Sequence, residues 1–148
     1  MSKTIKLISI FSIVELIFHG IWEYTACGIF YTMEGQDSIE HQILMIQATF
    51  GDLLIALGLF LILAFVNHRS NWFLEHWERK DLIISLLYSV LVAFYFEVHA
   101  LHLDRWGYQE NMPLVYGTSI AVLPVLQLAL LLPLGFVITR KIYQIKFT

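Results

Sequence analysis

The sequence predicts an all-α protein in which four helices cross a membrane and pack as one bundle. Hydrophobic residues make up 58% of the 148 residues and charged residues 14%, against roughly 45–50% and about 25% in soluble domains. Three stretches (53–66, 82–96 and 114–139) contain no charged side chain. A spanning helix needs about 20 mostly apolar residues, and these stretches reach that length with their polar flanks. One integral membrane domain over residues 1–148 is therefore expected.

The breaks between the spans carry the residue types of turns and loops. Asp37 or Ser38 is expected to cap the second span and Asp81 the third, while Pro113 suits the first turn of the fourth. The predicted spans cover residues of about 4–31, 40–66, 81–103 and 113–139.

The first span has one alternative interpretation, a cleaved secretory signal. Basic residues precede an apolar run, and the segment Tyr24 to Cys27 resembles a lipoprotein cleavage site. However, Glu15, His19 and Glu23 interrupt the region that a signal peptide needs apolar. The segment is therefore interpreted as a span that stays in the protein.

The distribution of Lys and Arg predicts the orientation, because cytoplasmic loops carry an excess of these residues. Arg105 is the only one of the nine basic residues that falls on the opposite side from the others. Both termini and the loop 67–80 are therefore expected in the cytoplasm. In that loop, aromatic residues are mixed with charged ones, which indicates a short helix in the membrane interface. The eight basic residues on the predicted cytoplasmic side are Lys3, Lys6, Arg69, Arg79, Lys80, Arg140, Lys141 and Lys146.

Polar residues within the spans fall on defined helix faces. Glu15, His19 and Glu23 follow one another at intervals of four residues, so each is rotated by only about 40° from the last and the three form one stripe. In the second span, His41 and Asp52 share a face. The polar side chains of all four spans lie between the middle of the membrane and its outer surface. The cytoplasmic half of the bundle is mostly aliphatic. They predict a polar pocket that opens outward, with Asp52 and Gln127 of the fourth span as its floor.

This pocket is the candidate site. A charge at mid-membrane costs about 2.5–3.5 kcal/mol or more, so such residues pair inside the bundle and are functional by default. Carboxylates and imidazoles together bind Zn, Fe, Mn or Cu, and they also exchange protons. The candidate metal ligands are Glu15, His19, Glu23, Asp52, Glu97, His99 and His102, and the expected pocket lining adds Gln47, Pro124, Gln127, Trp106 and Tyr108.

The same residues are compatible with functions other than a metal or proton site. Polar residues that only fix helix packing would make the chain a non-catalytic subunit or scaffold, and a small transporter would need an oligomer to enclose a path. A haem between His19 and His99 or His102 is a further alternative. A dinuclear metal centre is another alternative, although the Glu-x-x-His motif of such bundles is absent here. The single cysteine, Cys27, excludes a disulfide relay within one chain, and the net charge of -3 does not suggest a nucleic-acid partner.

The last third of the chain carries one recognisable pattern. It reads R-W-x-Y-x-x-x-M-P from Arg105 to Pro113, then a glycine, then L-P-x-L-Q from Leu123 to Gln127 and a later proline. This resembles a pattern in small, uncharacterised bacterial membrane proteins of four spans. The resemblance implies the bacterial inner membrane as the location, and it implies no activity.

Overall fold

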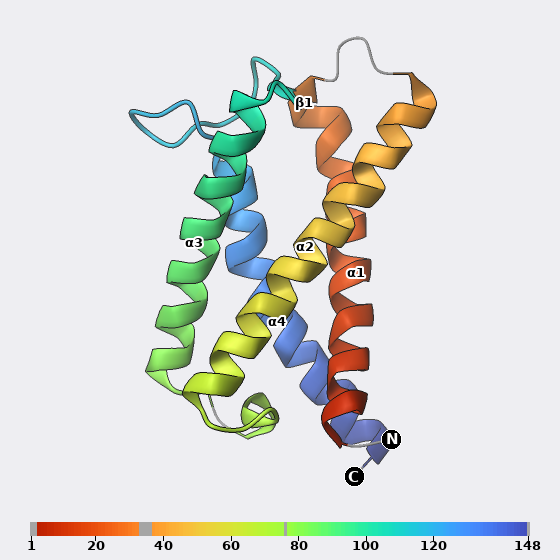
Figure 1. Ribbon diagram of the computed structural model, residues 1–148, viewed down its shortest axis with the longest axis vertical. Coiled ribbons are helices and arrows are strands. Elements are labelled where there is room, and N and C mark those ends of the chain that lie inside the picture. The colour runs from red at the N-terminus through yellow and green to blue at the C-terminus, as the bar shows by residue number, and fades with distance from the viewer. Residues whose placement is uncertain (1–2, 33–36, 76, 148) are drawn as a thin grey trace.

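The chain folds into a bundle of four long helices (Figure 1). The structure is a computed structural model that describes residues 3–32, 37–75 and 77–147. Residues 33–36, between the first two predicted spans, and residue 76 of the loop 67–80 therefore lie outside it. Within the described residues, four helices are long and apolar enough to cross a membrane. By length and hydropathy, the chain is therefore a multi-pass membrane protein. The helices are α1 (Lys3–Phe30), α2 (Ser38–Val66), α3 (Arg79–His102) and α4 (Val122–Phe147).

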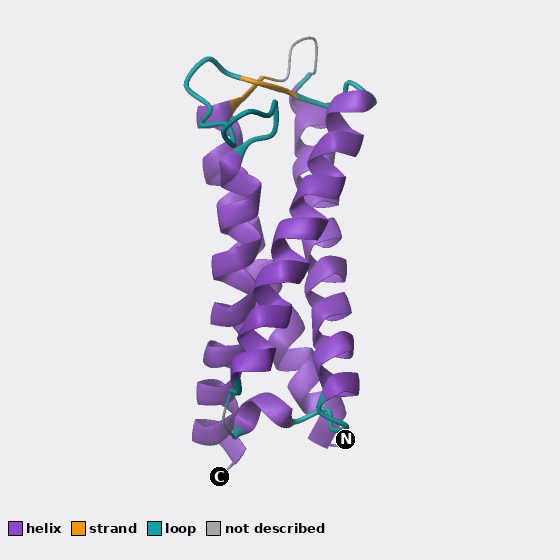
Figure 2. Cartoon of the chain, turned by 90° about the vertical axis from the view of Figure 1, so that its left-hand side faces the viewer, coloured by secondary structure: helices purple, strands orange, loops and turns teal. Residues whose placement is uncertain are grey.

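A small two-stranded ribbon closes one end of the bundle, opposite to the two chain termini (Figure 2). Strand β1 (Tyr31–Thr32) pairs antiparallel with β2 (Gly107–Tyr108), so that Tyr31 lies opposite Tyr108. The backbones come so close that a Cβ on Gly107 would lie 2.6 Å from Thr32 Oγ1. The ribbon thus holds the segment after α3 against the end of α1.

Side chains of the first turns define where α2 and α3 begin. Asp37 is the N-cap of α2, as predicted, and its carboxylate accepts hydrogen bonds from the backbone N–H groups of Ile39 and Glu40 at 2.8 Å. For α3, the predicted N-cap Asp81 lies one turn inside the helix. Asp81 lies three residues inside the N-cap Glu78 and accepts a bond from its backbone N–H at 2.9 Å, so it still satisfies an N–H group that the helix leaves unpaired.

The fourth helix begins at Val122 and not at Pro113, so the predicted start was wrong. Residues between β2 and α4 form a loop in which Leu114 pairs with Ala121 and the chain reverses through Gly117, whose φ is 75°. That backbone conformation suits glycine, and it ends any helix begun at Pro113. Pro124 consequently lies in the first turn of α4, where its missing N–H leaves no bond unmade, and it does not kink the helix.

The helices do not contact one another equally. α1 packs against both α2 and α4, and α3 packs mainly against α4. α2 and α3 diverge towards the end that carries the ribbon (Figure 1). They are joined elsewhere, because Asn67 Nδ2 donates to Asp81 Oδ1 at 2.8 Å and Tyr88 Oη donates to the carbonyl of Ile55 at 2.8 Å. The bundle is therefore closed at one end of the α2–α3 pair and open at the other.

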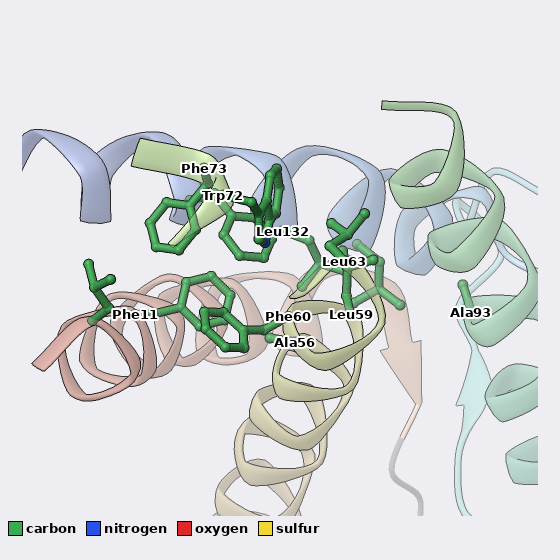
Figure 3. Packing of buried hydrophobic residues seen from close by; sticks show 12 residues of the cluster. Phe11, Ala56, Leu59, Phe60, Leu63, Trp72, Phe73, Ala93 and Leu132 are labelled. Carbon is green, nitrogen blue, oxygen red and sulfur yellow. The ribbon is translucent and has the colours of Figure 1, made fainter. Parts of the chain in front are cut away.

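An aromatic core lies in the half of the bundle near the termini. Figure 3 shows Phe11, Phe60, Trp72 and Phe73 within it. Phe11 of α1 stacks on Phe136 of α4 with ring centroids 4.4 Å apart. The 3₁₀ helix η1 (Trp72–Leu74) supplies Trp72 and Phe73, which are 1% and 0% exposed and each lie 5.2 Å from the Phe136 ring. The sequence predicted a short helix on the membrane surface here. The helix exists, but its rings point inward because the space between α1, α2 and α4 at this end needs filling.

The predicted orientation can be tested by labelling. Lys and Arg place the loop 67–80 in the cytoplasm, so Glu75→Cys should react with an impermeant thiol reagent only after the cells are opened. Tyr116 lies in the loop before α4 and is fully exposed, so Tyr116→Cys should react in intact cells. Both changes are made in a Cys27→Ala background, because Cys27 is the native thiol. The reverse labelling pattern would invert the orientation.

Candidate functional site

The stripe on α1 faces the interior of the bundle. Glu15 and His19 are both 0% exposed, one helical turn apart, with Glu15 Oε2 lying 3.1 Å from His19 Nε2. Space for the carboxylate comes from Gly135 of α4, where a Cβ atom would collide with the Glu15 side chain. Sequence reasoning missed Gly135. Its only signal was a lone glycine within an apolar helical stretch.

Gln127 of α4 is the centre of the polar cluster. Its Nε2 donates hydrogen bonds to Glu23 Oε1 at 3.0 Å and to Asp52 Oδ2 at 2.7 Å, and it lies 3.0 Å from His19 Nδ1. One amide group thereby joins side chains of α1, α2 and α4. Its position is a consequence of the later start of α4, which places Gln127 in the second turn of the helix.

The His19 ring has an acid at each of its two nitrogens. Nε2 lies 3.1 Å from Glu15 Oε2, and Nδ1 lies 3.1 Å from Asp52 Oδ2. Neither Glu15 oxygen nor His19 Nε2 meets the angular requirement of a hydrogen bond with any residue that the structure describes. The Asp52 side chain is 17% exposed. The three groups thus run from a closed position at Glu15 to an accessible one at Asp52.

A second acid, Glu97 of α3, is held by the ribbon. The Tyr108 hydroxyl donates a hydrogen bond to Glu97 Oε2 and accepts one from the backbone N–H of Ala121 at 3.3 Å. Burial raises the pKa of Tyr108, and the bond to the Glu97 carboxylate raises it further, so the phenol stays protonated and donates. The Tyr31 ring packs edge-on against Tyr108, at 5.8 Å between centroids. Tyr31 was not among the predicted residues.

A cavity of about 180 Å³ separates Glu97 from the cluster around Gln127. It lies at the open end of the α2–α3 pair, and the aromatic core closes the bundle below it. Arg105 and Trp106 line it from the loop after α3. Of the residues predicted from the sequence, those that line this cavity are Glu23, Gln47, Asp52, Glu97, Trp106, Pro124 and Gln127.

Two predicted ligands lie elsewhere. His99 and His102 are exposed on the outer face of α3, and the His99 ring stacks on Tyr95 at 6.2 Å. His99 is two residues from the buried Glu97 and therefore about 200° round the helix from it. Neither histidine reaches the acids or His19, so the alternative of a haem between His19 and these residues has no pair of ligands here.

The positions of the acidic residues and histidines can be compared with those that a bound metal ion requires. In the parts of the chain that the structure describes, no three His, Cys, Asp or Glu side chains are arranged so that they could hold a metal ion. The amide nitrogen of Gln127 lies where His19, Glu23 and Asp52 converge. What the geometry does contain is a buried network of one imidazole and three carboxylates beside a cavity.

Comparison with known proteins adds no further constraint on this site. Residues of the C-terminal sequence pattern lie at the cavity. Trp106, Pro124 and Gln127 line it, and the Tyr108 hydroxyl donates a hydrogen bond to Glu97. The likeness to small bacterial membrane proteins stays a prediction. Searches of protein-family models, of curated proteins and of solved structures found no match.

Proposed function

We propose that this membrane protein binds and releases protons through Glu15, His19 and Asp52, and that it exchanges them with the cavity. One observation carries the proposal: His19 has a carboxylate 3.1 Å from each ring nitrogen. An imidazole takes up a proton on one nitrogen and releases one from the other, which makes histidine a proton shuttle near neutral pH. A proton that arrives at Asp52 can therefore reach the closed position at Glu15 by way of His19.

The chemistry of the neighbours supports this assignment. With Nδ1–H directed at Asp52, Nε2 can accept a proton from Glu15. With Nε2–H directed at Glu15, Nδ1 can accept from the Gln127 amide when one of the two amide hydrogens turns to it from Glu23 or Asp52. In both neutral tautomers of His19, Nδ1 has a hydrogen-bond partner, either Asp52 or Gln127. The contacts of Nδ1 therefore exclude neither tautomer. Burying charge in a membrane is costly, which favours a network whose net charge is close to zero. A proton that moves from one group of the network to another leaves that net charge unchanged.

The experiment that tests the proposal replaces Glu15 with glutamine. Infrared difference spectra between acid and alkaline pH, recorded on protein in lipid nanodiscs, report protonated and ionised carboxyl groups separately. We expect the wild type to show a titrating carboxyl signal that Glu15→Gln removes, because glutamine keeps the size but carries no exchangeable carboxyl proton. Glu110→Gln, at an exposed loop position, is the matched control and should leave this signal unchanged.

A scaffold function makes the opposite prediction. If the polar residues only held the helices together, Glu15→Gln would keep the size and polarity of the side chain and would change neither the infrared spectra nor the stability appreciably. An unchanged titrating signal in a folded Glu15→Gln protein therefore contradicts proton exchange. A transporter that acts as an oligomer is compatible with the loss of signal, and it would use the same relay.

Binding of a divalent metal ion is the second candidate. The described side chains are not arranged to hold an ion, so a metal would require a rearrangement around the point that His19 Nδ1, Glu23 Oε1 and Asp52 Oδ2 all contact. These are ligand atoms that zinc takes in proteins. The amide nitrogen of Gln127 fills that point and cannot itself act as a ligand, so Gln127 would have to turn its oxygen inward. Elemental analysis of protein purified without chelators tests this candidate. A near-integer metal ratio that is lost in Asp52→Asn would favour it over proton exchange.

A further inference from the structure

We infer that the cavity binds the positively charged head group of a lipid-soluble organic cation, which enters between α2 and α3. The inference rests on the proposed function in one respect: the cation and the exchanged proton would share the Asp52 carboxylate. It adds the chemical class of the ligand and the route by which the ligand arrives.

The route follows from the helix arrangement. The cavity is lined by Met45 and Ala48 of α2 and by Val92 and Phe96 of α3, the two helices that diverge at this end (Figure 1). Phe96 is 48% exposed and therefore lies at the opening. In a bilayer this opening faces the acyl chains. A ligand that is already dissolved in the membrane can thus reach the cavity without passing through the ribbon and loop that close its end.

The charge of the cavity selects a cation. Glu23, Asp52 and Glu97 all line it, and the groups that donate hydrogen bonds to them are the neutral Gln127 amide and Tyr108 phenol. In the described part of the chain, none of the three forms an ion pair with Lys or Arg. Asp52 does lie 3.1 Å from His19 Nδ1, which is a cationic partner only when the imidazole is protonated. Three carboxylates with at most one such partner are costly in a membrane interior, and a bound ammonium group offsets that cost.

One basic residue at the cavity could argue against a cationic ligand. Arg105 lines the cavity, but its guanidinium lies over the ring of Trp106, 5.4 Å from the centroid. It is exposed at the rim and leaves the interior of the cavity to the three acids. A guanidinium held on an aromatic ring also shows that this rim tolerates a cation against its π face.

The cavity is large enough for the head group of the ligand only. A volume of about 180 Å³ is below the roughly 300–1,000 Å³ of sites that enclose a drug-sized molecule. It accommodates a head group such as a trimethylammonium, and the remaining, apolar part of the ligand lies between α2 and α3. Apolar side chains such as Ile55 and Leu128 complete the walls. An amphipathic amine or quaternary ammonium compound fits this description.

Binding of the cation should displace protons. The groups that face Asp52 are Glu15, His19 and Glu23 on α1, with Gln127 on α4, and Glu97, Tyr31, Tyr108 and Arg105 lie around the cavity. A positive charge beside Asp52 opposes a proton on Asp52 or His19. Binding should therefore strengthen as the pH rises and the acids ionise, and it should release protons to the solution.

The test uses dodecyltrimethylammonium and its uncharged analogue, in which carbon replaces the quaternary nitrogen, on the full chain in lipid nanodiscs. Empty nanodiscs correct for partition into lipid. We expect saturable binding of the cation, at least tenfold tighter than that of the neutral analogue, and proton release seen with an indicator dye in weak buffer. Asp52→Asn combined with Glu97→Gln should weaken binding at least tenfold, while Glu110→Gln should not.

The outcomes separate this inference from the proposed function. Equal binding of the charged and neutral compounds to the wild type overturns the cation site, even if the double variant does not fold, and leaves the Glu15 infrared result untouched. Selective binding of the cation without proton release supports the site and counts against proton exchange. Selective binding that persists in a folded double variant overturns the assignment to Asp52 and Glu97.

Discussion

Gly135→Ala is expected to abolish proton exchange although it changes no titratable group. The added Cβ would occupy the place of the Glu15 carboxylate, so the carboxylate has to leave its position 3.1 Å from His19 Nε2. Both side chains are fully buried, and a well-packed interior offers few alternative positions. The titrating carboxyl signal in the infrared difference spectrum should be lost or shifted, as in Glu15→Gln.

A matched control for this prediction is Gly28→Ala on α1. A Cβ at Gly28 meets no atom within 4 Å, so the same substitution there should leave the signal intact. Alanine should even stabilise that helix slightly, by about 0.5–1 kcal/mol, because glycine loses more backbone entropy on folding. If Gly135→Ala keeps the wild-type spectrum, Glu15 does not depend on the space that this glycine provides.

Trp72→Ala is expected to have the largest effect on stability, lowering the free energy of unfolding by about 3–5 kcal/mol. The Trp72 ring is 1% exposed and packs 4.9 Å from Trp77 and 5.2 Å from Phe136, measured between ring centroids. Truncation would leave a cavity that α1, α2 and α4 cannot close without moving. Denaturant titration of the purified protein, followed by helix content, measures the change.

Two further variants show whether this effect comes from packing. Trp72→Phe keeps most of the ring and removes an indole N–H that has no hydrogen-bond partner in the described residues, so it should cost far less than alanine. Tyr116→Ala removes a fully exposed aromatic ring and should stay within about 0.5 kcal/mol of the wild type. A loss of less than about 1 kcal/mol in Trp72→Ala would mean that η1 lies on the surface, as the sequence had suggested.

Local patterns determined much of this protein. The first three spans were predicted to within two residues at each end, because apolar length and charged flanks are properties of consecutive residues. Asp37 was recognisable as a cap for the same reason. The intervals of four residues between Glu15, His19 and Glu23 placed these side chains on one face, and the helix period alone decides that.

The tertiary structure decided where α4 begins and which residues meet. Pro113 is a good first residue for a helix, but the pairing of Leu114 with Ala121 across Gly117 competes with that local preference and prevails. His99 and His102 resembled metal ligands by composition, yet the face of α3 that carries Glu97 is the one turned inward.

The meeting of His19, Asp52 and Gln127, which are far apart in sequence, depends on how three helices are rotated about their axes. That rotation is set by packing between helices, including the space left by Gly135 and the rings of Phe11 and Phe136. A single sequence contains the period of each helix but no measure of the angle between them. The polar residues and a pocket between them were therefore predictable from the sequence, and the contacts that join His19, Asp52 and Gln127 were not.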